Sequence, residues 1–484
     1  MIDASAKNLA KCFPGLETLI LERSHALTET GFLKNFTNLK KVRIFLCPRL
    51  FDLAGLSSKT SLTSLSLRGC GSITNLPSLS ALTNLETLYI GGGFGGGCDL
   101  LDNISSLSGL SSLKTLTLCS LESLVDVRNL QSLSLLETLE LRNCHRVETL
   151  PPLIKLSRLS TLKVDNCSSL GGLPDFESMV SLREISMRYC RLQQPFRDLQ
   201  QPFSSLRKLQ LEGNMMKDYK FLSHFPKLKF LGLSDNINNP PNLQVISALF
   251  SLETLLLSCC SMNNLEQLSS LSTLRTLDLG GNRTLSQLNP LSSLSALQSL
   301  NLQDTKVCEL RPLHALFALQ SLNLSRCRHV DDLGPLHGLS ALQTLNLSRC
   351  IELHDLGPLR GLSNLQALDL SQCYSLADID CLSSLSSLKT LNLRGCSMLY
   401  DLASLASCIA CVSLNLAGCT SLSNVSPLFT LSSLKQLDLG NCENLTLSAV
   451  KPLATMSTLR SINLVGCYQI RVVDREPLFG NRLL

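Results

Sequence analysis

The sequence of 484 residues is rich in leucine, contains no tryptophan, and carries a formal net charge of only +5. A charge this small does not favour nucleic acid or an anionic membrane as the partner, and no apolar run approaches the ~18 residues that a membrane-spanning helix needs. A globular chain of this length would hold two or three domains, but a repeat array can reach any length because each unit packs only on its neighbours.

The chain repeats a unit that begins with Leu-x-Leu, and the first of these leucines is numbered here as position 0. The clearest copies begin with LNLSRC, LNLSRC, LDLSQC, LNLRGC, LNLAGC and LDLGNC, and they follow one another every 23 residues between Leu322 and Cys442. Self-similarity at this period, with Leu-x-Leu followed by Cys or Asn, is the signature of a leucine-rich repeat. Twenty units, most of them 22–24 residues long, have position 0 at Leu19, Val42, Leu65, Leu88, Leu116, Leu139, Leu162, Ile185, Leu209, Leu231, Leu255, Leu277, Leu300, Leu322, Leu345, Leu368, Leu391, Leu414, Leu437 and Ile462.

Each unit is predicted to form one short strand and one compact return segment. Positions 0 and +2 are apolar almost everywhere, and they point the same way because side chains alternate along a strand. Proline often lies ten residues before the next position 0, as at Pro152 and Pro335, which disfavours a long helix there. We therefore predict an α/β-type repeat solenoid. It would be a right-handed horseshoe with a parallel β-sheet on the concave face and turns and 3₁₀ segments on the convex face.

A single domain is predicted over residues 1–484, and two of its segments break the rhythm of the repeats. A Gly-rich insertion occupies 91–103, GGGFGGGCDLLDN. No Gly-Lys-Ser/Thr follows it, so it does not match a phosphate-binding loop, and we interpret it as a bulging flexible loop. The repeats of 214–241 are irregular, and we interpret them as a bend or a distorted joint.

Position +5 is occupied by cysteine or asparagine in most units. The chain turns inward after the strand, so its backbone groups need partners away from water. Asparagine supplies an amide for them, while cysteine is a small, weak donor. The members of this row are Cys47, Cys70, Cys144, Cys167, Cys190, Cys260, Cys327, Cys350, Cys373, Cys396, Cys419, Cys442 and Cys467, with Asn214, Asn236 and Asn282.

Metal binding or disulfides would be the alternative role for these cysteines. They occur once per coil, and the single Cys-x-x-Cys motif, Cys408 to Cys411, occupies positions where other units place core leucines. We predict no metal site and no cofactor. Many buried free thiols fit a reducing compartment, and MIDASAKNLAKCF lacks the apolar segment of a secretory signal, so an intracellular protein, cytoplasmic or nuclear, is expected.

A second polar row stands at position +10, with Asp332, Asp355, Asp378, Asp401 and Asn424. Short side chains of this kind bond backbone donors at the start of a turn, so we interpret them as turn caps; the Gly-x-Asp motif of calcium-binding β-helices is missing. The histidines fall at unrelated positions. No paired carboxylates, nucleophile with a base, or metal-ligand set is recognisable, and the protein is predicted not to be an enzyme.

The concave face is the expected binding surface. From Asn301 onward position +1 is always Asn or Asp, residue types that form strands poorly; either hydrogen bonds between adjacent coils or a polar groove for a partner would explain the row. The N-terminal half instead offers Tyr and Arg, which are typical of binding hot spots, and specific recognition is expected there. The candidate partner-binding residues are Arg43, Phe45, Arg68, Tyr89, Glu140, Arg142, Lys163, Arg188, Tyr189, Phe230, Asn323, Asn346, Asp369 and Asn392.

The unit L-x-L-S-x-C-x-x-L-x-D-L-x-P-L-x-x-L-S-x-L-x-x-L resembles the cysteine-containing leucine-rich repeats of trypanosomatid proteins, best between Leu300 and Cys467. The N-terminal half, for example LPPLIKLSRLSTLKVDNCSSLGGLP, also looks like the repeat region of plant intracellular immune receptors. The resemblance implies a horseshoe and a protein-binding role. Some relatives carry an N-terminal zinc-binding RING domain; this chain has no such cluster, so ligase activity is not carried over.

The predicted function is that of a non-catalytic scaffold that binds a protein partner on its concave face. Two alternatives remain. One is a substrate-receptor or regulatory arm of an enzyme complex of the ubiquitin-ligase or phosphatase type. The other is RNA binding through the slightly basic N-terminal half, which would weaken with salt.

Overall fold

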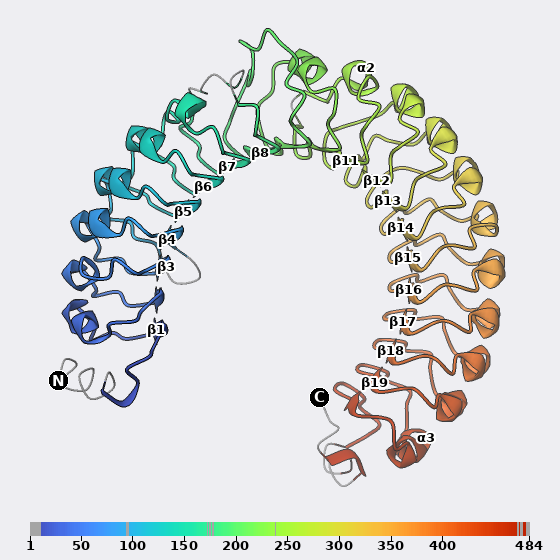
Figure 1. Cartoon of the computed structure of the whole chain (residues 1–484). Helices are drawn as coiled ribbons and strands as arrows, with labels where there is room; N and C mark the ends of the chain where they lie inside the picture. The colour runs from blue at the N-terminus through green and yellow to red at the C-terminus, as the bar shows by residue number, and fades with distance from the viewer. Residues whose placement is uncertain are drawn as a thin grey trace. The chain divides into compact units, whose positions relative to one another are not determined.

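The protein consists of two compact units, Met1–Asn239 and Pro240–Leu484. In each unit the coils place their strands along one side and their 3₁₀ helices along the other (Figure 1). The boundary between the units lies inside 214–241, the segment whose repeats are irregular in sequence. That residues 1–484 form a single domain remains a prediction. The computed structural model describes residues 11–92, 96–171, 173, 176, 179–237, 239–471, 474 and 478–480, so Gly93, Phe94 and Gly95 of the predicted insertion lie outside the described residues.

The first unit contains strands β1 to β10 and 3₁₀ helices η1 to η7. Its strands are β1 Thr18–Glu22, β2 Lys41–Phe45, β3 Ser64–Arg68, β4 Thr87–Gly91, β5 Thr115–Cys119, β6 Thr138–Arg142, β7 Thr161–Asp165, β8 Glu184–Ser186, β9 Lys208–Gln210 and β10 Phe230–Gly232. Its 3₁₀ helices are η1 Gly31–Asn35, η2 Ala54–Leu56, η3 Pro77–Ala81, η4 Ser105–Gly109, η5 Arg128–Ser132, η6 Leu153–Lys155 and η7 Lys220–His224.

The second unit contains strands β11 to β20. These are β11 Thr254–Leu256, β12 Thr276–Asp278, β13 Ser299–Asn301, β14 Ser321–Asn323, β15 Thr344–Asn346, β16 Ala367–Asp369, β17 Thr390–Asn392, β18 Ser413–Asn415, β19 Gln436–Asp438 and β20 Ser461–Asn463. Most coils return through a 3₁₀ helix, and two contain a single α-helical turn. The helices are α2 Leu243–Ile246, η8 Glu266–Ser270, η9 Asn289–Ser293, η10 Arg311–Ala315, η11 Gly334–Leu336, η12 Gly357–Gly361, η13 Asp380–Ser384, η14 Ala403–Ser407, η15 Ser426–Thr430, α3 Leu447–Val450 and η16 Lys451–Thr455.

The strands within each unit are parallel, and position 0 of one coil stands opposite position 0 of the next. Leu322 of β14 faces Leu345 of β15, for example, and Leu345 faces Leu368 of β16. Nearly all leucines at positions 0 and +2 are buried along both units, as are most of those of the return segments; Leu21 and Leu100 are exceptions. This confirms the predicted leucine-rich repeat solenoid with 3₁₀ return segments.

The polar row at position +10 caps the return segments as predicted. Asp332 Oδ1 accepts the backbone N–H of Gly334 at 2.7 Å, and Asp355 Oδ1 accepts that of Gly357 at 2.7 Å. Asp378, Asp401 and Asn424 make the same contact two residues ahead at 2.8–2.9 Å. Each side chain satisfies a donor at the start of its 3₁₀ helix.

The Asn and Asp residues at position +1 bond mainly to their own backbone. Asn346 Oδ1 accepts the N–H of Ser348 at 2.9 Å, and every member of the row from Asn301 to Asn463 accepts the N–H two residues ahead. The strands that carry these residues are three residues long, whereas β1 to β7 are five residues long. Strands β8 to β11 are equally short without an Asn or Asp at position +1. Bonds between side chains of adjacent coils join Asn301 to Asp278, Asn392 to Asp369 and Asn463 to Asp438.

A left-handed residue at position +4 turns the chain toward the core in every coil but that of β4. Its φ lies between 52° and 77°, whether the residue is Gly281, Asn143 or Arg326. A residue with a Cβ in this region costs roughly 1–2 kcal/mol that glycine avoids. The turn directs the next side chain, at position +5, into the interior.

The +5 row is buried, as the sequence predicts. The thiol of Cys373 donates to the carbonyl oxygen of Leu347 in the preceding coil at 3.2 Å, and Cys396 repeats the contact with Leu370 at 3.2 Å. Asn282 does more, because its Nδ2 donates to two carbonyls at 2.7 and 2.9 Å while its Oδ1 accepts two backbone N–H groups at 2.9 and 3.0 Å. The row thus binds the backbone of one coil to that of the next.

Candidate functional site

The strand face of the first unit holds most of the predicted partner-binding residues. Side chains at positions −1, +1 and +3 leave the strands on the side opposite the leucine core, because side chains alternate. Two groups of them make contacts across neighbouring strands. One lies on β2 to β4, and the other lies on β6 to β10.

The group on β2 to β4, called here the Arg68 stack, consists of Phe45, Arg68 and Tyr89. The Arg68 guanidinium carbon lies 3.9 Å from the centroid of the Tyr89 ring and 5.7 Å from that of Phe45. Cation–π contacts of this kind hold a guanidinium over an aromatic face. The Tyr89 hydroxyl donates to the carbonyl of Gly92 at 2.7 Å, and burial raises the pKa of Tyr89 to about 12. Arg68 is exposed and both rings are half-buried, so the stack is fixed in place while still facing solvent.

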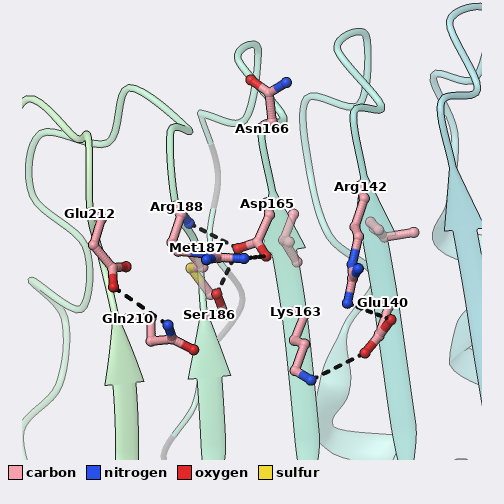
Figure 2. Close-up of polar contacts among 12 residues, drawn as sticks. Glu140, Arg142, Lys163, Asp165, Asn166, Ser186, Met187, Arg188, Gln210 and Glu212 are labelled. Carbon is pink, nitrogen blue, oxygen red and sulfur yellow. Dashed lines mark hydrogen bonds and ion pairs between the residues drawn. The ribbon is translucent and has the colours of Figure 1, made fainter. Parts of the chain in front are cut away.

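A ladder of charges of alternating sign runs across β6 to β9. Glu140 forms ion pairs with Arg142 at 3.0 Å and with Lys163 of the next strand at 3.2 Å. Figure 2 shows both of these side chains turned toward the Glu140 carboxylate. Lys163 also lies 3.8 Å from Glu184 of β8. Arg142 and Lys163 therefore each have a carboxylate partner.

The ladder ends on an aromatic ring. Lys208 of β9 forms an ion pair with Glu184 at 3.0 Å. The Lys208 ammonium also lies 5.1 Å from the centroid of the Phe230 ring on β10. Phe230 is thus joined through a cation–π contact to the same surface as the charged residues.

Asp165, at the end of β7, accepts hydrogen bonds on both of its carboxylate oxygens. Its Oδ1 accepts the Ser186 hydroxyl at 2.6 Å and the backbone N–H of Arg188 at 3.1 Å, and its Oδ2 accepts the Arg188 guanidinium at 2.7 Å (Figure 2). Burial alone would raise the pKa of Asp165. The hydrogen bonds from Arg188 and Ser186 outweigh burial and hold the pKa below its usual value. Asp165 is therefore charged at neutral pH and fixes the direction of Arg188.

Glu212 lies on the other side of Arg188, and its pKa is shifted in the opposite direction from that of Asp165. It is buried, and its Oε2 finds no hydrogen-bond partner within the described residues, while Gln210 donates to Oε1 at 3.4 Å (Figure 2). Burial raises the pKa of Glu212, and its bonds to its own backbone and to Gln210 offset this only in part. The Asp165 charge adds to the rise. Two carboxylates of one cluster thus shift in opposite directions.

Tyr189 projects from the turn that follows β8, where its φ is 56°. Its hydroxyl donates to Asp235 Oδ2 at 2.6 Å, two coils further on. This hydrogen bond, followed by burial, raises the pKa of Tyr189 to about 12. The ring crosses Gly213 so closely that a Cβ there would overlap it, so glycine is needed for Tyr189 to span the gap. The ring remains 48% exposed.

The other predicted residues are not part of these groups. Arg43 on β2 is exposed, and no ion pair reaches it from the described part of the chain. In each candidate residue of the second unit, the side-chain oxygen accepts a hydrogen bond from the backbone N–H two residues ahead. These residues are Asn323, Asn346, Asp369 and Asn392.

Five residues of the first unit's strand face did not enter the predicted set. They sit at positions −1, +3 and +4, which share the surface with position +1. Alternation of side chains along each repeat could have indicated the first two of these positions, because −1, +1 and +3 face the same way. The residues missed are Asp165, Glu184, Lys208, Glu212 and Asp235.

The described residues contain no cluster of three or more His, Cys, Asp or Glu side chains arranged to hold a metal ion. None of their helices has the length and apolarity required to cross a bilayer. The strand face of the first unit presents fixed aromatic, guanidinium and carboxylate groups.

No protein-family model matches the chain, and comparison with curated proteins finds no match. Solved structures do resemble it. Mouse RP105, in its complex with MD-1, is 20% identical with a TM-score of 0.55, over 95% of this chain and 89% of that one. A leucine-rich repeat protein of Leptospira interrogans is 20% identical with a TM-score of 0.52, over 94% and 98%.

The functional domain of InlJ from Listeria monocytogenes, which includes a cysteine ladder, is 20% identical with a TM-score of 0.51, over 75% of this chain and 69% of that one. At this identity the likeness concerns the fold alone. The chain has the leucine-rich repeat fold that these three structures share.

Proposed function

We propose that the protein is a non-catalytic scaffold that binds a protein partner on the strand face of the unit Met1–Asn239. The observation that carries this proposal is the Arg68 stack, in which the guanidinium lies 3.9 Å from the Tyr89 ring on an exposed surface. Tyr and Arg are enriched among residues that dominate binding energy at protein interfaces. Fixed side chains also lose less conformational entropy when a partner binds.

The charge ladder and Tyr189 extend the proposed surface across β6 to β10. Their ion pairs hold long side chains in one arrangement, which supplies complementarity to a partner of matching charge pattern. The strand face of the second unit offers less. Its Asn and Asp side chains are short and already accept backbone hydrogen bonds. The first unit is therefore the better candidate for specific recognition.

Replacing Arg68 by Ala tests this proposal. Removing a hot-spot side chain is expected to weaken partner binding by roughly 30-fold or more, with little change in stability because Arg68 is exposed. Arg394→Ala is the matched control, since Arg394 occupies position +3 in the second unit and is also exposed. Affinity purification with quantitative mass spectrometry would compare the proteins that the parent and the two variants retain.

Loss of the same proteins from Arg68→Ala and from Arg394→Ala, or from neither, would contradict the assignment of the site. The same purification separates the alternatives from the sequence. A catalytic subunit that co-purifies would favour the substrate-receptor or regulatory arm of an enzyme complex. RNA binding is less well supported, because Arg142, Lys163 and Lys208 have carboxylate partners and are not free for phosphates.

The proposal includes a reducing intracellular compartment, cytosol or nucleus. It is supported by 21 free cysteines, of which only Cys12 and Cys308 are exposed. Burial raises the pKa of the Cys373 and Cys396 thiols to about 12, and the thiolate is the reactive form. We expect a thiol reagent to modify Cys12 and Cys308 rapidly in the native protein, the partly exposed Cys119 and Cys259 more slowly, and the buried thiols only after denaturation. Disulfides trapped by alkylation of freshly lysed cells would argue against this compartment.

We also propose that the repeats are related to the cysteine-containing repeats of trypanosomatid proteins or to those of plant intracellular immune receptors. This relation is supported by the +5 cysteine row and by the position +10 turn caps, both of which recur from coil to coil. An alignment that recovers both rows in either group of proteins, at the same offsets, would separate the two possibilities.

A further inference from the structure

A basic groove lies on the second unit, Pro240–Leu484. It has a volume of about 840 Å³ and is formed where the chain leaves strands β12 to β16. Its lining includes five cationic side chains from four coils and an aromatic ring at one end. These are Arg283, Lys306, Arg326, Arg328, Arg349 and Tyr374.

Most of the positive charge in this groove has no internal partner. Arg283 forms an ion pair with Asp304 at 2.8 Å. Arg326, Arg328 and Arg349 are exposed, and no carboxylate pairs with any of them in the stretch 239–471, which is described throughout. The charges on the strand face of the first unit, by contrast, are mostly neutralised across the sheet.

Two of these arginines stand at position +4, where the backbone is left-handed. Arg326 has a φ of 63° and Arg349 a φ of 62°. The same position is Asp304 and Gln372 in the flanking coils, and Gly281 and Gly395 in the coils beyond them. A long side chain is thus present where glycine would relieve backbone strain. The backbone N–H groups of Arg326 and Arg349 bond to the next coil at 2.8 Å, so both side chains leave from fixed points on adjacent coils.

The dimensions of the groove suit a short extended peptide. Neighbouring strands are about 4.8 Å apart, so the four steps from the coil of β12 to that of β16 span roughly 19 Å, the length of about six extended residues. Guanidinium groups bind carboxylates through two parallel hydrogen bonds. Tyr374 and Ile351, which are 49% and 38% exposed, supply apolar contact in the same groove.

The surroundings disfavour a long polyanion. Other hollows on the coils of β13 to β16 carry carboxylates: Asp331 and Asp332 line one, together with Arg311, and Asp355 and Asp378 line another, together with Arg360. A nucleic acid strand that extended beyond the arginines would bring its phosphates toward these carboxylates. A ligand with a few negative charges confined to about six residues would not.

We propose that this groove binds an acidic peptide segment of a protein, with its carboxylates on Arg326, Arg328 and Arg349 and an apolar side chain against Tyr374. The site is independent of the strand face of the first unit. Fluorescein-labelled hexaglutamate is the probe, and its affinity for the full chain is measured by fluorescence anisotropy at about 0.15 M salt. Hexauridylate, a short RNA, serves as the competing class of ligand.

The decisive variant is Arg326→Asn with Arg349→Asn. Asparagine occupies position +4 at Asn143, Asn166 and Asn441 with positive φ, so the variant should melt at the same temperature or higher. Two exposed charge pairs are expected to be worth about tenfold in hexaglutamate affinity. The matched control, Arg394→Asn with Arg460→Asn, removes the same charge from exposed positions of the same unit outside the groove and should change affinity less than twofold to threefold.

Loss of hexaglutamate binding in the groove variant, with the control unaffected and the melting temperature maintained, would support the proposal. Three results would overturn it. They are no binding of hexaglutamate to the parent, equal weakening by both double variants, and tighter groove-dependent binding of hexauridylate than of hexaglutamate.

Discussion

Replacing Cys373 by Gln is expected to lower the free energy of unfolding by about 3 kcal/mol, because the longer side chain overfills a closed site and leaves its amide only partly bonded. Cys373 is fully buried, and its thiol donates to the carbonyl of Leu347 at 3.2 Å. Urea denaturation would give the change, and hydrogen exchange of the amides in β15 to β17 would show whether the loss is local to the substituted coil.

Cys373→Asn is the matched control, since asparagine already occupies position +5 in three coils. Asn282 donates to the carbonyls of Leu257 and Leu279, and the equivalent acceptors for a residue at 373 are Leu347 and Leu370. We expect Cys373→Asn to remain within about 1 kcal/mol of the parent because its Nδ2 has two carbonyl acceptors equivalent to those of Asn282. If Gln is tolerated as well as Asn, position +5 is less tightly enclosed than described.

The carboxylates on either side of Arg188 should respond in opposite ways to neutralisation. Asp165→Asn is expected to cost about 2 kcal/mol at pH 7, because charged hydrogen bonds to Arg188 and Ser186 are lost. The pKa of folded Asp165 lies below its ordinary value of 3.8. Its charged form therefore stabilises the fold above that pH, and the deficit of the variant should shrink as the pH falls through the lowered pKa.

Glu212→Gln should stabilise the protein by about 1 kcal/mol at pH 7, because it removes a buried charge whose Oε2 has no partner among the described residues. The pKa of Glu212 in the folded protein lies above the ordinary value of 4.5. The charged form of Glu212 therefore opposes folding once the pH exceeds that ordinary value. The gain should disappear below about pH 4, where both states are protonated. Urea midpoints measured between pH 3 and 8 would test the pair. Parallel pH profiles for the two variants would contradict the opposite shifts.

The repeat period of the sequence predicted which residues form the strands and which leucines form the core. Leu322, Leu345 and Leu368 are aligned because a fixed spacing and an alternating strand leave one arrangement that buries them all. The turn caps at Asp332 and Asp355 followed from the same spacing, since their partners are only two residues away. Contacts within one coil are local, and a repeat pattern indicates them directly.

Side-chain partners across coils were harder to predict. Lys163 is within reach of both Glu140 and Glu184, and Tyr189 bonds to Asp235 two coils away. These pairings depend on side-chain rotamers and on the absence of a side chain at Gly213, which the spacing of leucines does not specify. One of the two explanations predicted for the Asn and Asp row at position +1 was hydrogen bonding between adjacent coils, and some of its members make such bonds. The more regular contact is the bond from each side chain to the backbone two residues ahead, which was not predicted.

The uniform register of the coils has a consequence for how such a chain can change over generations. Each coil presents the same carbonyl and amide groups, at the same height, to the coil that follows. A whole coil can therefore be gained or lost by unequal recombination without leaving its neighbours mismatched. Lineages could lengthen or shorten the recognition surface in whole units, while the outward residues diversify almost independently of the interior.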